Sequence, residues 1–384
     1  RNSLEIDEGD PFNKLLNAKS INNLRSLNIF ALIKSDIKEG TNINTKVLDI
    51  EVKEKPTGEI SLGAGYGSEG GTVGFSITEN NFLGKNIKLQ TDLRTTEDSI
   101  KGSFSIVNPN FNYSNKSLVT SIQNSSIDKM SDSGYKTNKT GFTLGTRYEQ
   151  YENTFFSPAL VTELEDLTTN ADASDSLKKQ TGSYFESKIN YSLDFDKRNQ
   201  KFQTSSGTRT IVRQGIPLVS NEYALMNGFE SEKWVKFRND MVTNFGVYGR
   251  AVNSVTDENV RVTERIKLPR NRLKGFQAGR IGPVDNKDYV GGNYAVSLNF
   301  DTTLPMILPS AESIDFKYFI DAGNVWGIDY SDTIDDSNKI RSATGITVDW
   351  FTPIGPLNFS FAKDITKAST DKTESFQFNL GTTF

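Results

Sequence analysis

The chain has 384 residues, a formal net charge of −4, no cysteine and no histidine. The two absent residue types exclude the usual zinc and iron–sulfur sites, thiol chemistry and any nucleophile activated by histidine. The mean hydropathy of −0.49 and the lack of a long apolar run exclude a transmembrane helix, but not transmembrane strands, which need only about 9–11 residues with one apolar face.

Residues 1–57 differ in pattern from the rest of the chain. Apolar side chains recur there at roughly helical spacing, at Leu15, Leu16, Ile21, Leu24 and Leu27. The segment 45–55 then alternates apolar and charged residues, which predicts one or two strands after the helix. Pro56 and Gly58 break the pattern, so we expect a small α+β unit that ends near residue 57. The chain begins with Arg1 rather than Met, and we expect it to be a piece of a longer precursor.

From Gly58 onward the sequence alternates apolar and polar residues with a period of two, and no segment has a convincing helical pattern. In the segment 313–326, Ile314 and Phe316 lie on one face and Asp315 and Asp321 on the other, with Phe319 as the exception. The pattern predicts sixteen strands, at about 59–67, 70–79, 86–97, 100–108, 116–126, 138–150, 153–166, 182–195, 206–216, 221–235, 239–252, 291–304, 313–326, 340–351, 355–363 and 374–384.

Strands with one apolar face fit either a soluble all-β protein or a membrane barrel whose apolar face meets lipid. Three features favour the barrel. Charged residues lie in the middle of strands, short turns such as 81–86 and 351–357 alternate with long hydrophilic loops, and the chain ends on Phe384, the last residue of an alternating strand. The predicted strand number is also even, as a bacterial up-and-down barrel requires. The long loops are predicted at 127–138, 166–182 and 253–290. The predicted fold class is therefore all-β, a 16-stranded antiparallel transmembrane β-barrel.

The segment 270–283, RNRLKGFQAGRIGP, is unusually basic and rich in glycine for a chain of net negative charge. Composition alone indicates a solvated surface loop. The segment also occurs in a fixed order with four other motifs, which together carry more information than composition. They are NNFLG at 80–84, FIDAGNVW at 319–326, WFTPIGPLNFSFA at 350–362 and FQFNLGTTF at 376–384. Together with the glycine-rich stretch 52–71, these motifs resemble the BamA family of outer-membrane β-barrel assembly proteins.

The resemblance covers nearly the whole chain and implies two domains. Residues 1–57 would be a partial last POTRA domain in the periplasm, and residues 58–384 a barrel in the bacterial outer membrane. The long loop 253–290 would fold inward into the lumen of that barrel. These boundaries agree with the change of pattern near residue 57.

The resemblance also implies a tether inside the barrel. An Arg-Gly-Phe motif at the tip of the family's inward loop is matched here by Lys274, Gly275 and Phe276, and its acidic partner on the lumen wall by Asp321. Lysine keeps the charge of arginine but not its planar fork. Asn299 lies where the family usually has a second acid, with Asp301 two residues later.

The first and last strands form a predicted lateral gate. Glycines in the segment 62–71 weaken strand packing, and Gly381 lies in the last predicted strand. Ordinary barrel closure is the alternative to a gate that offers an edge to an incoming strand. The gate residues are Ile60, Leu62, Ala64, Tyr66, Phe378, Leu380, Gly381 and Phe384.

The resemblance implies an insertase that folds and inserts outer-membrane β-barrel proteins through this seam. We expect no enzymatic activity, no catalytic residue, no cofactor and no metal. The expected partners are unfolded outer-membrane β-barrel substrates, accessory outer-membrane lipoproteins, periplasmic chaperones and the lipid bilayer; the net charge disfavours nucleic acid. The alternatives are a related translocation or assembly protein, TamA-like or a two-partner secretion transporter, and a passive porin.

Overall fold

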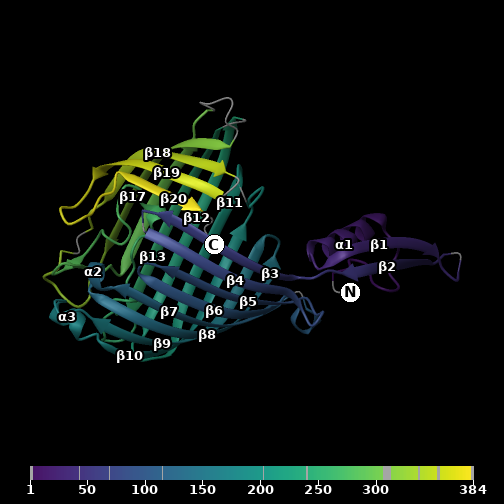
Figure 1. Cartoon of the computed structure of the whole chain (residues 1–384), viewed down its shortest axis with the longest axis horizontal. Coiled ribbons are helices and arrows are strands. Elements are labelled where there is room, and N and C mark those ends of the chain that lie inside the picture. Colours follow the sequence, from purple (N-terminus) through teal and green to yellow (C-terminus); the bar gives the residue numbers. More distant parts are fainter. Residues whose placement is uncertain are drawn as a thin grey trace.

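The computed structural model contains a β-barrel and a small N-terminal unit that lies beside it (Figure 1). It describes residues 3–42, 44–68, 70–114, 116–201, 203–238, 241–305, 313–335, 338–352 and 355–381. Within these residues sixteen strands close the barrel, and neighbouring strands are antiparallel. None of the described helices is long and apolar enough to cross a bilayer.

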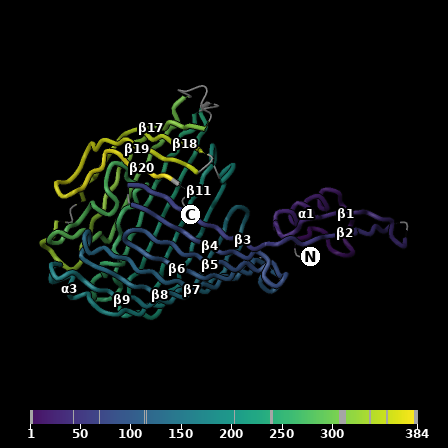
Figure 2. Tube along the Cα trace, viewed as in Figure 1, coloured from purple at the N-terminus to yellow at the C-terminus, as the bar shows by residue number. Residues whose placement is uncertain are grey.

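The strands run up and down around the barrel in the order of the sequence, so that the last strand meets the first (Figure 2). The sixteen strands are β3 (Gly58–Gly67), β4 (Gly70–Phe82), β5 (Ile87–Thr96), β6 (Ser99–Asn108), β7 (Ser117–Lys129), β8 (Tyr135–Tyr151), β9 (Thr154–Thr169), β10 (Gly182–Asp196), β11 (Gly207–Ser220), β12 (Ala224–Arg238), β13 (Met241–Ser254), β16 (Tyr294–Thr303), β17 (Ile314–Trp326), β18 (Arg341–Thr352), β19 (Gly355–Thr366) and β20 (Phe376–Gly381). We call the end of the barrel where β3 begins the near rim, and the opposite end the far rim.

The prediction of a 16-stranded antiparallel barrel is confirmed. Among the described strand ends, the largest difference from prediction is at β11, which continues to Ser220 rather than 216. The prediction of a long loop at 127–138 is wrong. There β7 and β8 extend toward each other, and a single helical turn, α2 (Met130–Ser133), followed by Gly134 with φ of 70°, joins them. The polar residues of 127–138 belong to the end of a hairpin that faces water, not to a long loop.

Side chains alternate between the outside of the barrel and its lumen, as expected for strands. On β16, Val296 and Leu298 are exposed on the outside, whereas Ala295, Ser297 and Asn299 are buried against the lumen contents. Large apolar side chains on the outside would be unfavourable in water, but they suit a surface that lipid covers. The polar side chains on the lumen face then need hydrogen-bond and ion-pair partners from within the protein.

The N-terminal unit consists of α1 (Lys14–Ser26), β1 (Phe30–Glu39) and β2 (Lys46–Glu54). Asn13 caps the helix by accepting a hydrogen bond from the Leu15 N–H group at 2.8 Å. Ile21 and Leu24 are buried, and β1 pairs with β2 in a two-stranded antiparallel sheet. This arrangement agrees with the α+β unit predicted for residues 1–57; whether the unit is a POTRA domain stays a prediction.

The long segment between β13 and β16 occupies the lumen in the far-rim half of the barrel. It contains a short turn, η2 (Arg270–Arg272), and a small hairpin of β14 (Val284–Asp285) and β15 (Asp288–Tyr289). Its apolar side chains form a core with inward-facing residues of the wall, comprising Tyr248, Leu268, Leu273, Phe276, Ile281, Ala295, Val325 and Ala343. We call residues 255–293 the lumen loop. Two further short helical elements lie in other connections, η1 (Phe111–Tyr113) and α3 (Asp175–Lys178).

Candidate functional site

The tip of the lumen loop binds the wall of the barrel at β17. The Lys274 ammonium lies 3.1 Å from Asp321 Oδ2, and the backbone N–H of Lys274 donates to the same oxygen at 2.9 Å. The Asp321 side chain has 0% exposure. Both bonds are charge-assisted, which makes them stronger than neutral hydrogen bonds. The ion pair predicted from the sequence is therefore present.

A second carboxylate completes the site of the Lys274 ammonium. Asp301 Oδ1, on the neighbouring strand β16, lies 3.1 Å from Lys274 Nζ. Asn299 donates to Asp321 Oδ1 at 2.7 Å and to the Arg272 carbonyl oxygen at 3.0 Å. The acid missing at position 299 is thus supplied two residues along the same strand, while Asn299 holds Asp321 in place.

Phe319, the exception to the polar pattern of β17, lies directly beneath the tip. The Lys274 ammonium is 4.5 Å from the centre of the Phe319 ring, a distance at which a cation is attracted to an aromatic face. Phe319 has 0% exposure and the Lys274 side chain is 16% exposed, so the contact is largely buried. An apolar residue on a polar strand face was the sequence signal for this contact, although the sequence did not assign it a role.

Gly275 and Phe276 bring the loop backbone against the wall. Gly275 has φ of 87°, and an added Cβ would lie 3.0 Å from the Ala343 Cβ and 3.1 Å from the Ala362 Cβ. Only glycine suits both the backbone conformation and the space. The Phe276 side chain is 2% exposed and belongs to the lumen core.

The tip also pairs with the segment that leads into β20, a contact that the sequence did not predict. Glu374 N–H donates to the Gly275 carbonyl oxygen at 2.9 Å, and Gln277 N–H donates to the Lys372 carbonyl oxygen at 2.9 Å. Gln377 on β20 donates from its side chain to the Phe276 carbonyl oxygen at 3.1 Å. The tip therefore contacts both β17 and the start of the last strand.

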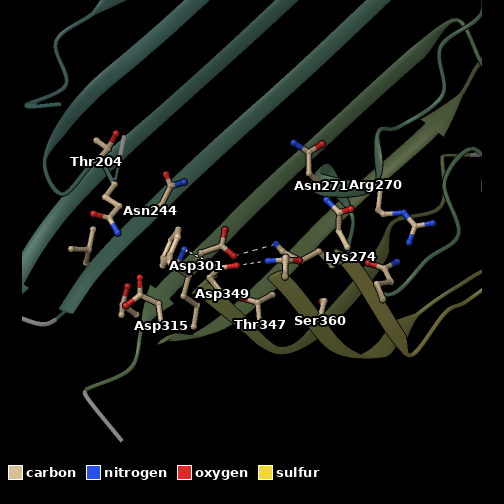
Figure 3. Close-up of a pocket in the computed structure, with 18 of the residues that line it drawn as sticks. Thr204, Asn244, Arg270, Asn271, Lys274, Asp301, Asp315, Thr347, Asp349 and Ser360 are labelled. Atoms are coloured by element: carbon tan, nitrogen blue, oxygen red, sulfur yellow. Dashed lines mark hydrogen bonds and ion pairs between the residues drawn. The ribbon is translucent and has the colours of Figure 1, made fainter. Parts of the chain in front are cut away.

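A polar cavity of about 970 Å³ lies in the lumen on the near-rim side of the tip (Figure 3). Lys274 and Asp301 line it, together with Asp315 and Asp349, which come from neighbouring strands. Lys317 pairs with Asp349 at 2.6 Å. The cavity reaches Gln377, Phe378 and Asn379 on β20, so it adjoins the junction of the last and first strands.

The described part of the junction between β20 and β3 is short, and its β20 side ends at Gly381. Within the described residues β20 pairs with β3 only at Gly65, Tyr66 and Gly67, opposite Gly381, Leu380 and Asn379. On its other side β3 pairs with β4 along its whole length, from Gly58 to Gly67. Ser68 adds a link at the far-rim end, where its N–H donates to the Phe378 carbonyl oxygen at 3.1 Å.

Two glycines of β3 let the seam close. An added Cβ would lie 2.7 Å from the Phe378 carbonyl oxygen at Gly67, and 2.9 Å from the Leu380 carbonyl oxygen at Gly65. A larger residue would push β20 away at these positions. The glycines of this stretch therefore allow the close approach of β20, in addition to weakening the packing of the strand.

The predicted gate residues fall into three groups. Tyr66, Leu380 and Gly381 take part in the seam, and the Tyr66 ring lies 6.0 Å from that of Phe378. Ile60 and Leu62 are 75% and 77% exposed on β3, and neither they nor Ala64 pair with a described residue of β20. Phe384 lies outside the described residues.

A closed 16-stranded transmembrane barrel, with a loop folded into its lumen and a short seam, defines a class of β-barrel membrane proteins. A model of the Omp85 superfamily domain matches residues 81–384, and the chain belongs to this superfamily. Within it the chain is of the BamA type, so the resemblance predicted from the motifs is confirmed.

Two curated relatives are outer membrane protein assembly factors named BamA. The one from Neorickettsia risticii is 25% identical over all of this chain and 53% of its own length. The one from Neisseria meningitidis is 23% identical over all of this chain and 54% of its own length. The chain thus spans about half the length of these relatives. A SAM50-like protein of Schizosaccharomyces pombe is 24% identical over 94% of this chain and 80% of its own length.

Solved structures show the same fold. The crystal structure of BamA from Haemophilus ducreyi lacking POTRA domains 1–3 has a TM-score of 0.90 and 21% identity, covering 100% of this chain and 81% of that chain. CdiB from Acinetobacter baumannii has a TM-score of 0.58 and 12% identity, covering 99% of this chain and 70% of that chain.

Proposed function

We propose that this chain is the membrane portion of a bacterial outer-membrane protein assembly factor that inserts β-barrel proteins through the seam between β3 and β20. The names of the BamA relatives support the assembly role. The single observation that carries the mechanism is the short seam, in which β3 pairs with β20 at Gly65–Gly67 among the described residues. Among the described residues none of β20 pairs with Gly58–Ala64, and in this proposal these residues form the edge that another strand uses.

An unpaired edge can template a new strand because its N–H and C=O groups need partners. In the proposed mechanism an unfolded barrel substrate pairs first with the edge of β3. The apolar faces of its strands enter the lipid, and burial of those faces supplies the free energy. No cofactor or catalytic residue takes part in this mechanism.

The remaining partners follow from the same proposal. The N-terminal unit would be the end of a POTRA domain in the periplasm, at the near rim of the barrel. Periplasmic chaperones would deliver unfolded substrates to that side, and accessory outer-membrane lipoproteins would bind there. The outside of the barrel would contact the lipid bilayer directly.

A disulfide across the seam tests the mechanism. Tyr66 and Leu380 are register partners, and these 384 residues contain no cysteine, so no other cysteine among them competes with Tyr66→Cys and Leu380→Cys for the bond. The matched control is Phe75→Cys with Leu93→Cys, register partners in the β4–β5 hairpin, which lies outside the seam. We expect the seam disulfide to stop assembly of barrel proteins in cells, and a reductant to restore it.

The control disulfide should leave assembly unchanged, because it joins strands that do not need to separate. If cells with a fully oxidised seam assemble barrel proteins at the normal rate, insertion does not require the seam to open, and the mechanism is wrong.

A further inference from the structure

The first limb of the lumen loop, residues 260–265, is buried against the wall formed by β8, β9 and β10. Val262 packs with Leu167 and Leu177 in a separate apolar cluster. Its backbone N–H donates to Gln180 Oε1 at 2.7 Å. This contact lies away from the tip, since the two packing clusters share no residue.

Arg261 is the centre of the contact. Its guanidinium lies 3.1 Å from Glu165 on β9, 3.3 Å from Glu222 and 3.4 Å from Glu264. It also stacks on the Tyr184 ring of β10, with 4.2 Å from Cζ to the ring centre. The Arg261 side chain is 4% exposed. The guanidinium therefore uses its fork and its flat face at once, which an ammonium could not do.

Further charges surround the same carboxylates. Lys139 on β8 lies within 3.8 Å of Glu163, Glu165 and Glu264, and Lys188 on β10 lies 2.7 Å from Glu186. Burial alone would raise the pKa of Glu264, but Lys188, Lys139 and Arg261 together lower it. Glu264 is thus held ionised as part of one buried network that joins loop and wall.

The two attachments lie on different parts of the barrel. Strands β11, β12, β13 and β16 separate β10 from β17 in the sheet order. The loop leaves the wall after β13, contacts β8–β10 through its first limb, and then reaches β17 with its tip. Its chain therefore crosses the lumen between two distant sectors of the wall.

We propose that Arg261 is a second positioning residue of the lumen loop, which anchors the first limb to β8–β10 independently of the Lys274 tip. With both anchors in place the loop braces the wall at β8–β10 against β17 and the start of β20. The inference rests on the proposed function only in the use of this brace: it would hold one side of the barrel fixed while the seam opens.

The test measures how fast a buried cysteine reacts with a maleimide in the folded full-length protein in membranes. Val262→Cys reports on the first limb and Leu273→Cys on the tip; both side chains are 2% exposed. Each reporter is combined with Arg261→Gln or Lys274→Gln. Arg209→Gln is the matched control, because Arg209 pairs with Asp194 at 2.9 Å on the same wall, with both partners outside the loop.

We expect Arg261→Gln to speed labelling at position 262 by at least about tenfold, since it removes the buried cation that joins Glu264 of the loop to Glu165 and Glu222, and near Glu165 and Glu264 leaves the more distant Lys139. Labelling at position 273 should stay within about twofold. Lys274→Gln should give the reverse, and Arg209→Gln should change neither position. Arg261→Lys, which keeps the charge and loses the fork, should give a smaller increase at position 262 and provides the comparison if Arg261→Gln does not fold.

Unchanged labelling at position 262 in Arg261→Gln and Arg261→Lys would overturn the proposal. So would equal acceleration at both reporters, because the loop would then have one attachment rather than two. The measurement needs no substrate protein, so a failure of the seam mechanism would not alter its outcome.

Discussion

At position 274 the resemblance implies an arginine, and the surroundings of the residue suit the lysine that this chain has instead. An ammonium is a compact point charge with three donors, whereas a guanidinium presents its donors in one plane. Here Lys274 contacts Asp321 and Asp301 at 3.1 Å each and faces the Phe319 ring. The second acid is Asp301, and Asn299 donates to Asp321 instead of pairing with the ammonium. The two carboxylates of the wall therefore surround a single compact charge.

Removal of the Lys274 charge should destabilise the barrel strongly. Lys274→Gln leaves the fully buried Asp321 without its cation, and we expect a loss of about 3–5 kcal/mol in the free energy of unfolding. Lys274→Arg should cost far less because it keeps the charge. Urea unfolding in lipid vesicles measures both.

Lys317→Gln on β17 is the control, because the Lys317–Asp349 pair, 35% and 21% exposed, is less buried than the Lys274–Asp321 pair, 16% and 0% exposed. We expect it to cost about 1 kcal/mol or less. A Lys274→Gln variant that is no less stable than Lys317→Gln would show that the tip is held by packing alone.

Lys267 in the lumen loop should make stability depend on pH. Burial, with Lys129 nearby, lowers the pKa of Lys267 from 10.5 to about 8. Its ammonium donates to Ser133 Oγ at 2.5 Å and lies 5.6 Å from the centre of the Tyr135 ring. Between about pH 8 and 10.5 the unfolded chain binds a proton that the folded protein does not, so the free energy of unfolding rises with pH.

The expected gain is on the order of 3 kcal/mol across that window, at 1.36 kcal/mol for each unit of pKa. The comparison is with Lys267→Met, which removes the titrating group and leaves the other lysines and tyrosines in place. The free energy of unfolding of the natural protein minus that of Lys267→Met should increase by that amount from pH 7.5 to 10.5. Parallel pH curves would mean that Lys267 has an ordinary pKa.

At the scale of elements, the strands could be predicted because each one repeats a local pattern that burial on one side and lipid on the other impose. The hairpin at 130–134 was mistaken for a long loop because a far-rim strand end in water is as polar as a loop. The contacts of Arg261 had no local signal at all. Its partners Glu165 and Glu222 lie far away in the sequence, and only closure of the barrel brings them together.

The seam should be the least protected junction between strands. Peptides from Gly58–Ala64 of β3 should exchange backbone hydrogens at least about tenfold faster than those of β5, which has the same length and is paired on both sides. The physical reason is that N–H groups on the β20 side of β3 have no described strand partner below Gly65. Hydrogen–deuterium exchange of the folded protein in lipid vesicles measures the difference.

Gly67→Ala should widen the difference, because its Cβ would lie 2.7 Å from the Phe378 carbonyl oxygen. Gly71→Ala on β4 is the control, since an added Cβ there meets only the Tyr66 ring, at 3.8 Å. Equal protection of β3 and β5 would mean that the edge of β3 is covered, and that the seam is no weaker than the other strand junctions.

For the whole molecule, the lumen contents decide between an assembly factor and a passive porin. The sequence predicted the loop tip and its acidic partner, but not that residues 255–293 fill the far-rim half with three apolar clusters. Such packing depends on side chains from the whole circumference of the barrel. A porin needs an open path from rim to rim, whereas here the open space of about 970 Å³ lies on the near-rim side of the tip.

The filled lumen predicts a low and unsteady conductance for the natural chain in a planar bilayer. A variant in which a short glycine–serine linker replaces residues 256–291 should form large and steady channels, because its wall is closed without the loop by direct pairing of β13 with β16. The double variant Arg261→Gln with Lys274→Gln keeps the loop but weakens both attachments, so it should flicker between the two levels. Large and steady channels in the natural chain would instead mean that the loop does not close the lumen in a membrane, and the porin alternative would be favoured.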